Sequence, residues 1–203
     1  MKVSIVSATD APVTTISLAM GTSYNKNDSS FKRVKTAAKH NHGSVFEFAN
    51  FVMRIDGISR ACANQLVRHR HGSYCQQSQR YVKYKELGLT DFVYPDSIGG
   101  NSDAQNAFIE AIKTASESYE KLLELGIKAE DARYVLPNAM TTSITVGMNA
   151  REFFNFLNLR LSKNAQWEIR ELAETMYNTL RAQNEEWDYL LSLYDEYMKN
   201  IIN

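Results

Sequence analysis

The sequence predicts an α+β fold in a single domain over residues 1–203. Composition is the first reason: 44% of the residues are hydrophobic and 23% are charged, which are globular proportions and exclude intrinsic disorder. Length is the second, because 203 residues match one domain on the usual scale of about 100–200 residues. The third is that short segments alternate as strands do, while longer segments toward the C-terminus have helical spacing.

The N-terminal part is expected to mix strands with short helices. Residues 2–7 alternate apolar and polar side chains, and residues 46–55 are aromatic and largely alternating, so both segments predict strands. Polar residues 24–30 predict a loop. Helices are expected over residues 12–20, 31–40 and 58–70, the last one ending at Gly72.

The clearest predicted helix covers residues 102–126. Apolar residues recur along one face, Ser102 can cap the N-terminus, and Gly126 is a C-terminal signal. The remaining expected elements are a β-branched strand over 141–148 and helices over 149–161 and 165–202, the last with a break near Asn184.

Several classes of protein are excluded or disfavoured. Lys plus Arg and Asp plus Glu number 23 each, so the net charge does not indicate a polyanion partner. No apolar run approaches the roughly 18 residues that span a bilayer, and the first ten residues lack the long apolar stretch expected of a signal peptide. Cys62 and Cys75 form no C-x-x-C motif, which favours free thiols in a reducing compartment and no metal site. We therefore expect a soluble, cytoplasmic protein without a membrane partner.

The neutral total conceals a basic segment. Residues 57–85 contain six cations and no acid, and arginine presents a fork of donors that suits phosphate oxygens. One alternative is that cations at a helix C-terminus only offset its dipole. Another is a nucleic-acid-binding module, because tyrosines lie among the cations, although the pI of about 6.9 is not that of such a domain. The six cations of residues 57–85 are Arg60, Arg68, Arg70, Arg80, Lys83 and Lys85.

A second polar cluster lies in the predicted helix over residues 149–161. At about 100° per residue, Arg151 and Asn155 share one face, whereas Arg160 lies near the opposite face. Phenylalanines and leucines lie between them, which favours a helix buried between partners. A surface helix with scattered polar residues is the alternative for this segment. For the chain as a whole, a purely structural helical oligomer that uses its acidic C-terminal helix is a further alternative.

The basic segment resembles the signature of the flavin-dependent thymidylate synthase family. Arg68-His69-Arg70 is followed after seven residues by Ser78 and then by Arg80-Tyr81. Three further segments resemble family motifs and occur in family order over residues 42–175. They are His42-Gly43-Ser44-Val45-Phe46-Glu47, the run from Ala132-Arg133 to Pro137, and Asn149 to Arg160 with the residues 165–170 that follow.

The resemblance implies a specific reaction and fold. The reaction is the conversion of dUMP to dTMP, with methylenetetrahydrofolate as carbon donor and NADPH as the reductant of a bound FAD. The implied fold has a central sheet, mixed or antiparallel, flanked by long helices. The implied assembly is a homotetramer with sites at subunit junctions, without a nucleic-acid partner.

The resemblance also implies two sets of site residues. Residues expected to contact FAD are Ser44, Arg68, His69, Arg70, Gln76, Asn149, Arg151 and Asn155. Residues expected to line dUMP are Gln65, Arg68, Gln76, Gln77, Ser78, Gln79, Arg80, Arg133 and Arg160. Whether His71 faces solvent or the flavin stays open.

Arg160 is the expected catalytic residue. It would stabilise negative charge that develops on the uracil ring, which is an electrostatic role. A thiolate at Cys75, attacking C6 of uracil, is the other chemical route. The resemblance argues against that route, because this family needs no nucleophile from the enzyme.

Overall fold

The computed structural model describes residues 1–199. The chain forms two compact units. The first unit contains residues 1–55, 66–74 and the C-terminal segment from 145 onward, and the second contains residues 56–65 and 75–144. Strands β2 and β4 each begin in one unit and end in the other. The expectation of one domain over residues 1–203 stays a prediction.

Four strands form one sheet in the order β1-β2-β4-β3. A hydrogen bond from Thr9 N to Asn50 O joins the end of β1 to the start of β2, and one from Gln77 N to Ser143 O joins the end of β3 to the start of β4. Neighbouring strands are therefore antiparallel, and the predicted α+β class is confirmed. The strands are β1 (Lys2–Ala8), β2 (Asn50–Ser59), β3 (Ser73–Gln76) and β4 (Thr141–Asn149).

The second strand begins later than the aromatic alternation predicts. Residues Gly43–Phe48 form the short 3-10 helix η1 instead. Phe46 is buried there with its ring 5.5 Å from that of Phe154, whereas Phe48 is 54% exposed. Packing against helix α7 therefore overrides the strand pattern before Asn50, while Phe51, Met53 and Ile55 are buried in alternation as expected of a strand.

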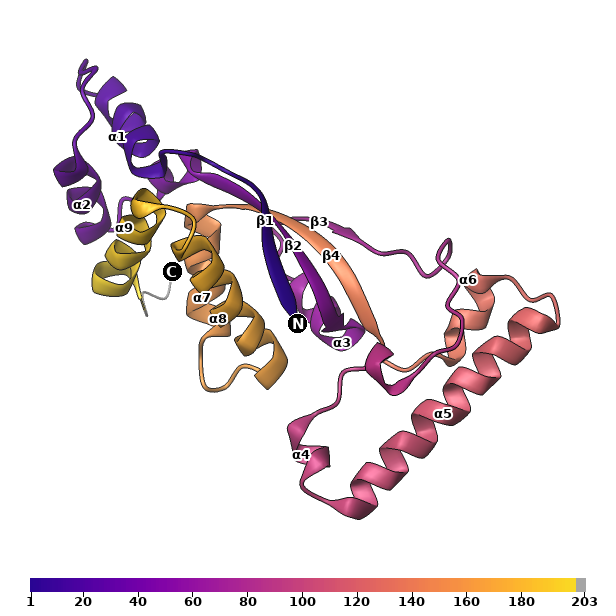
Figure 1. Ribbon diagram of the computed structural model, residues 1–203. Helices are drawn as coiled ribbons and strands as arrows, with labels where there is room; N and C mark the ends of the chain where they lie inside the picture. The colour runs from indigo at the N-terminus through magenta and orange to yellow at the C-terminus, as the bar shows by residue number, and fades with distance from the viewer. Residues whose placement is uncertain (200–203) are drawn as a thin grey trace. The chain divides into compact units, whose positions relative to one another are not determined.

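In the first unit, helices pack together and against the sheet. Helix α8 contacts both α7 and β1, and α9 contacts both α8 and α1 (Figure 1). The predicted break at Asn184 is confirmed, because its side chain caps α9 by accepting from Trp187 N. The end of the helix predicted over 165–202 lies outside the described residues. The helices are α1 (Pro12–Thr22), α2 (Phe31–Lys39), α7 (Ala150–Arg160), α8 (Trp167–Arg181), α9 (Glu185–Leu193) and the π-helical turn η4 (Tyr194–Met198).

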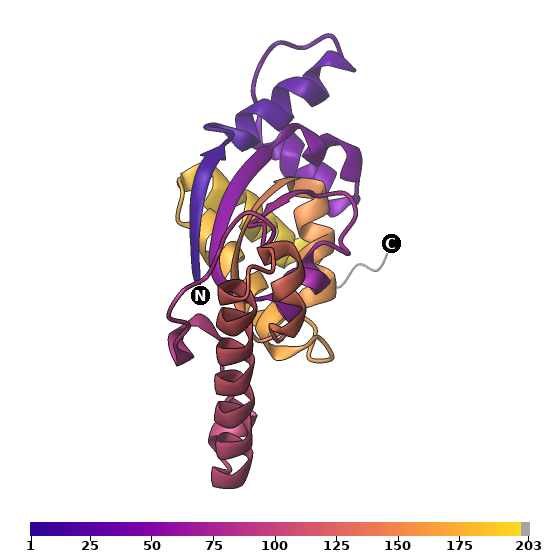
Figure 2. The ribbon, with the colours of Figure 1, turned by 90° about the vertical axis from the view of Figure 1, so that its right-hand side faces the viewer.

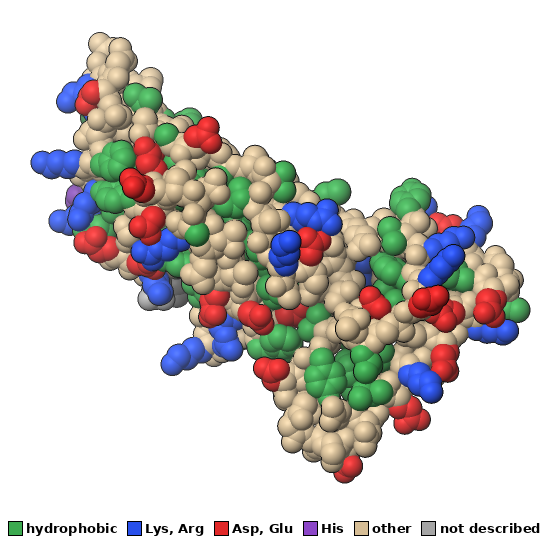
Figure 3. Space-filling model, in the orientation of Figure 1, with side chains coloured by type: hydrophobic (Ala, Val, Ile, Leu, Met, Phe, Trp, Pro, Cys, Tyr) green, Lys and Arg blue, Asp and Glu red, His purple; other side chains and the backbone are tan. Residues whose placement is uncertain are grey.

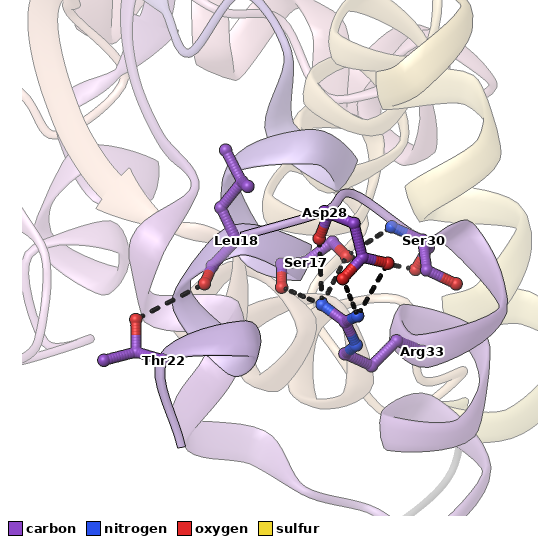
Figure 4. A network of polar contacts seen from close by, with 6 residues as sticks. All are labelled: Ser17, Leu18, Thr22, Asp28, Ser30 and Arg33. Atoms are coloured by element: carbon purple, nitrogen blue, oxygen red, sulfur yellow. Dashed lines mark hydrogen bonds and ion pairs between the residues drawn. The ribbon is translucent and has the colours of Figure 1, made fainter. Parts of the chain in front are cut away.

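A network of hydrogen bonds connects the loop between α1 and α2 to both helices. Arg33 donates to the carbonyl of Ser17 at 2.9 Å and to the carboxylate of Asp28 at 3.1 Å (Figure 4). Ser30 N donates to the Ser17 hydroxyl at 2.7 Å. The predicted loop over 24–30 is confirmed, and these contacts hold the two helices as a pair.

Helix α3 ends four residues earlier than predicted, at Leu66. A turn follows, in which the Tyr74 hydroxyl donates to the carbonyl of His69 at 2.6 Å. A Cβ atom at Gly72 would lie 2.5 Å from the Tyr74 hydroxyl oxygen. Gly72 is therefore needed to make room for Tyr74 rather than to end the helix.

The second unit is built around α5 (Ser102–Glu124), which is one straight helix about 35 Å long by its rise per residue (Figure 2). Asn101, not Ser102, caps it, since the Asn101 side chain accepts from Asp103 N and Ala104 N. Gly126, with φ +82°, ends it as predicted. The other elements are α3 (Arg60–Leu66), η2 (Leu89–Asp91), α4 (Asp96–Gly99), α6 (Ala129–Ala132) and η3 (Arg133–Val135).

The core of the second unit contains Phe92, Ile112 and Met140. Acidic and basic side chains are interspersed with hydrophobic ones on the visible face of this unit (Figure 3). In the part of the chain that the structure describes, no helix combines the length and apolar character that a bilayer crossing requires.

Candidate active site

The turn between α3 and β3 presents two arginines to solvent. Arg68 and Arg70 are exposed, and neither pairs with an acid among residues 1–199. The carbonyl of His69 between them is held by the Tyr74 hydroxyl. The turn therefore offers two guanidinium groups to an anion from a braced backbone.

His69 is buried, unlike its two neighbours. Its Nε2 lies 2.5 Å from Oε1 of Glu152, and its ring meets that of Phe156 edge-on at 5.3 Å. Burial lowers the pKa of His69 below its ordinary value, and the positive charge of Arg160 acts in the same direction, while the Glu152 carboxylate opposes both. Burial therefore favours the neutral ring of His69, and Glu152 is its hydrogen-bond partner.

Helix α7 and η1 line a cavity of about 500 Å³ in the first unit. Three residues expected at FAD meet here: Asn149 at the cap of α7, and Arg151 and Asn155 on its first two turns. Four of the lining residues are asparagines, which suit the hydroxyl groups and ring edges of a nucleotide-like ligand. The lining residues are Asn41, Gly43, Glu47, His71, Asn149, Arg151, Glu152, Phe154, Asn155, Asn158 and Met198.

Two lining residues of this cavity, Arg151 and Glu47, form an ion pair. Nη1 of Arg151 lies 2.5 Å from Oε1 of Glu47, and both side chains are about half exposed. A Cβ atom at Gly43 would lie 3.1 Å from Nε of Arg151, so the glycine leaves room for the guanidinium. Ser44, which follows Gly43 in η1, is exposed.

Arg160 ends α7 with part of its guanidinium unsatisfied. Its Nε is buried and has no hydrogen-bond partner within the described chain. Its charge lowers the pKa of His69, and it opposes the burial that raises the pKa of Tyr74 to about 12. A buried donor without a partner is costly, so Arg160 is suited to bind an acceptor on a ligand.

The second unit holds the remaining residues expected at dUMP. Gln76 donates to the Thr142 hydroxyl at 3.4 Å, and the Ser78 hydroxyl accepts from Arg80 N at 3.2 Å. Gln79 differs, because its side chain is buried with Nε2 at 3.4 Å from the sulfur of Met140. The residues of this group are Gln65, Gln76, Gln77, Ser78, Gln79, Arg80 and Arg133.

Arg80 and Arg133, which are far apart in the sequence, meet at Glu130. Nε of Arg80 lies 3.1 Å from Oε2 of Glu130, and Nε of Arg133 donates to the Glu130 carbonyl at 2.9 Å. Arg60 adds a buried Nη1 without a partner among the described residues. Burial lowers the pKa of Arg60, and the charge of Arg133 contributes in the same direction. Arg80 and Arg133 therefore meet at one residue, and Arg133 is close enough to Arg60 for its charge to act on it.

Two acids that contact the expected site residues, Glu152 and Glu130, were not among the residues expected from the sequence. Asn149 and Glu152 have the spacing of a helix cap, and Asn149 Oδ1 does accept from Glu152 N at 2.9 Å. That spacing indicates where α7 starts, but not that the Glu152 carboxylate reaches His69. No local pattern points to Glu130. His71, which the sequence left open, lines the cavity.

Comparison with known proteins decides the family. The model of the family described as thymidylate synthase complementing protein matches residues 4–184. This chain belongs to that family. A protein of Pyrococcus abyssi named flavin-dependent thymidylate synthase is 37% identical over 197 residues, which cover 91% of this chain and 81% of that protein. One of Geobacter sulfurreducens with the same name is 47% identical over 140 residues, covering 69% of this chain and 60% of that protein.

Membership in the thymidylate synthase complementing protein family confirms the resemblance found in the sequence. The matched region contains every residue of the expected FAD and dUMP sets. The chain spans less than two thirds of the Geobacter relative and about four fifths of the Pyrococcus relative.

Proposed function

We propose that this chain catalyses the reductive methylation of dUMP to dTMP, with methylenetetrahydrofolate as carbon donor. The observation that carries the proposal is the family match over residues 4–184, with relatives named flavin-dependent thymidylate synthase. The chain is accordingly a methyltransferase-type enzyme with FAD as its cofactor and NADPH as a co-substrate.

The residues of the first unit fit a flavin nucleotide. The cavity of about 500 Å³ is large enough for part of FAD, and its asparagines can bond to neutral rings and hydroxyls. Arg68 and Arg70, without acidic partners among residues 1–199, can bind a pyrophosphate. When bound and reduced by NADPH, FAD supplies the hydride for the reaction. The residues proposed to hold it are Ser44, Arg68, His69, Arg70, Gln76, Asn149, Arg151 and Asn155.

The proposed dUMP residues divide between binding and catalysis. Arg80, Arg133 and Ser78 bind the phosphate, for which two cations and a hydroxyl are suited. Arg160 stabilises the negative charge that develops on the uracil ring, and its buried Nε, which has no hydrogen-bond partner among residues 1–199, supports this role. The other proposed contacts are Gln65, Arg68, Gln76, Gln77 and Gln79.

The proposal also covers the fold, the assembly and the cellular location of the chain. The chain would adopt the flavin-dependent thymidylate synthase fold as one domain and assemble as a cytoplasmic homotetramer, with sites at subunit junctions and no nucleic-acid partner.

The test is a flavin spectrum followed by an activity assay. Purified protein is expected to be yellow, or to bind added FAD, and to release tritium from dUMP labelled at C5 when NADPH and methylenetetrahydrofolate are present. A colourless protein that ignores FAD and binds DNA with a steep dependence on salt would contradict the proposal and favour a nucleic-acid-binding module.

A further inference from the structure

Glu152 connects three of the residues proposed for the flavin site. Its carboxylate Oε1 lies 2.5 Å from Nε2 of His69 and accepts from Asn155 Nδ2 at 3.3 Å. Its backbone N–H donates to Asn149 Oδ1 at 2.9 Å. The residue is 9% exposed, so its carboxylate is in a place where an unpaired charge would be costly. Glu152 therefore depends on His69 as a partner.

The surroundings of His69 identify which ring nitrogen carries the proton. Nε2 faces the Glu152 carboxylate and, at 3.3 Å, the Glu152 main-chain carbonyl. Both groups are acceptors, so Nε2 must be the donor. In the neutral ring the proton is then absent from Nδ1, which is left as an acceptor.

Both ends of His69 are held. Glu152 of α7 holds the ring, and the Tyr74 hydroxyl of β3 holds the carbonyl. Arg68 and Arg70 flank this residue directly, so fixing His69 fixes the backbone that presents the two guanidinium groups. The other titratable or charged groups that act on His69 are Arg160 of α7 and His71 of the turn.

We propose that Glu152 is a positioning residue of the flavin site, which holds His69 as the Nε2–H tautomer and thereby orients the turn containing Arg68 and Arg70 against α7. This inference rests on the proposed function, because it takes FAD as the ligand. It adds Glu152, which lines the cavity, to the residues proposed for the site, and the role assigned to it acts through His69.

The first test reads the tautomer in the protein without ligand. The 15N chemical shifts of the His69 ring distinguish a proton on Nε2 from one on Nδ1. We expect the proton on Nε2 in the wild type, and a proton on Nδ1 would overturn the inference whatever any variant does. In Glu152→Gln, the pH at which the ring takes its second proton should fall, because the carboxylate that favours the imidazolium is gone.

The second test is FAD affinity, measured by quenching of flavin fluorescence. Glu152→Gln keeps the size of the side chain and removes its charge, and we expect the dissociation constant for FAD to rise about tenfold or more, the size of one lost hydrogen bond to a charged group. Glu171→Gln removes the same charge from an exposed position on α8 and should leave both the affinity and the His69 titration unchanged.

A double-mutant cycle separates positioning from general damage. His69→Phe keeps a ring beside Phe156 but has no nitrogen, so adding Glu152→Gln to it should weaken FAD binding no further. An equal loss in both backgrounds would overturn the inference. Wild-type protein that binds no FAD would overturn the proposed function and the inference together, whereas normal FAD binding by Glu152→Gln would overturn the inference alone.

Discussion

The carboxylate of Glu186, on α9, accepts a hydrogen bond from the Thr14 hydroxyl at 2.7 Å and another from the Thr14 backbone N–H at 3.0 Å. Thr14 lies in the first turn of α1, whose own cap residue, Ala11, has no side-chain acceptor. A residue about 170 positions away along the chain thus caps α1 and places a negative charge at the positive end of its dipole.

Removing this contact should destabilise the first unit. We expect Glu186→Gln to lower the free energy of unfolding by about 1 kcal/mol, as for loss of a helix cap. Urea denaturation followed by circular dichroism measures the change. Glu185→Gln is the matched control, because Glu185 also lies in the first turn of α9 but is exposed. Equal losses in the two variants would show that the contact with α1 is not responsible.

The pair formed by Asp28 and Arg33 should make stability depend on acid pH. The hydrogen bond from Arg33 lowers the pKa of Asp28 below its ordinary value of 3.8. Because the folded-state pKa is the lower one, the pair stabilises the fold above pH 3.8, and this contribution is lost as the pH falls through the folded value. NMR titration of the Asp28 carboxyl measures the pKa, which should rise toward its ordinary value in Arg33→Met. A pKa that does not move in this variant would contradict the assignment.

Replacing Arg160 should reduce turnover more than binding. Arg160→Ala removes the proposed stabilisation of charge on the uracil ring, and we expect kcat to fall by about 10²–10³-fold. Arg160→Lys keeps the charge but loses the guanidinium fork, and its loss should be intermediate. Tritium release from labelled dUMP measures the rate, with Arg170→Ala on α8 as the control. Full turnover by Arg160→Ala would rule out the catalytic role.

Cys75 should be dispensable for chemistry. The residue is exposed on β3, and Arg160 already provides the proposed route to charge at the uracil ring. We expect Cys75→Ala to keep its turnover within about twofold of the wild type, because the substitution removes an exposed thiol that the proposed route does not use. A variant that still bound FAD and dUMP but had lost turnover would restore the thiolate route.

Local patterns account for most of the fold. The helix over 102–126 was predictable because its apolar face, its cap region and Gly126 all agree, and the break at Asn184 because asparagine is a strong cap. The segment around Phe46 was not, since its packing on Phe154 lies more than 100 residues away in the chain. The turn that follows the early end of α3 contains a contact between Tyr74 and His69, which no periodicity reveals.

The site was predictable in part for the same reason. Arg151 and Asn155 are four residues apart on one helix, so their meeting in one cavity follows from helical spacing. The pairing of His69 with Glu152 joins residues 83 positions apart, and Glu152 has the place of an ordinary capping acid in the sequence. Such a pair is apparent only when both elements have been positioned in space.

Asn149 both caps helix α7 and lines the cavity. Its side-chain oxygen accepts the N-cap hydrogen bond from Glu152 N, and the same residue forms part of the wall of the cavity. A substitution of Asn149 that alters ligand recognition therefore also destabilises the first turn of α7. A ligand that binds the Asn149 amide stabilises that turn. Ligand occupancy and the local folding of α7 are thermodynamically linked at this position, and amide hydrogen exchange in the first turn of the helix would report how full the cavity is.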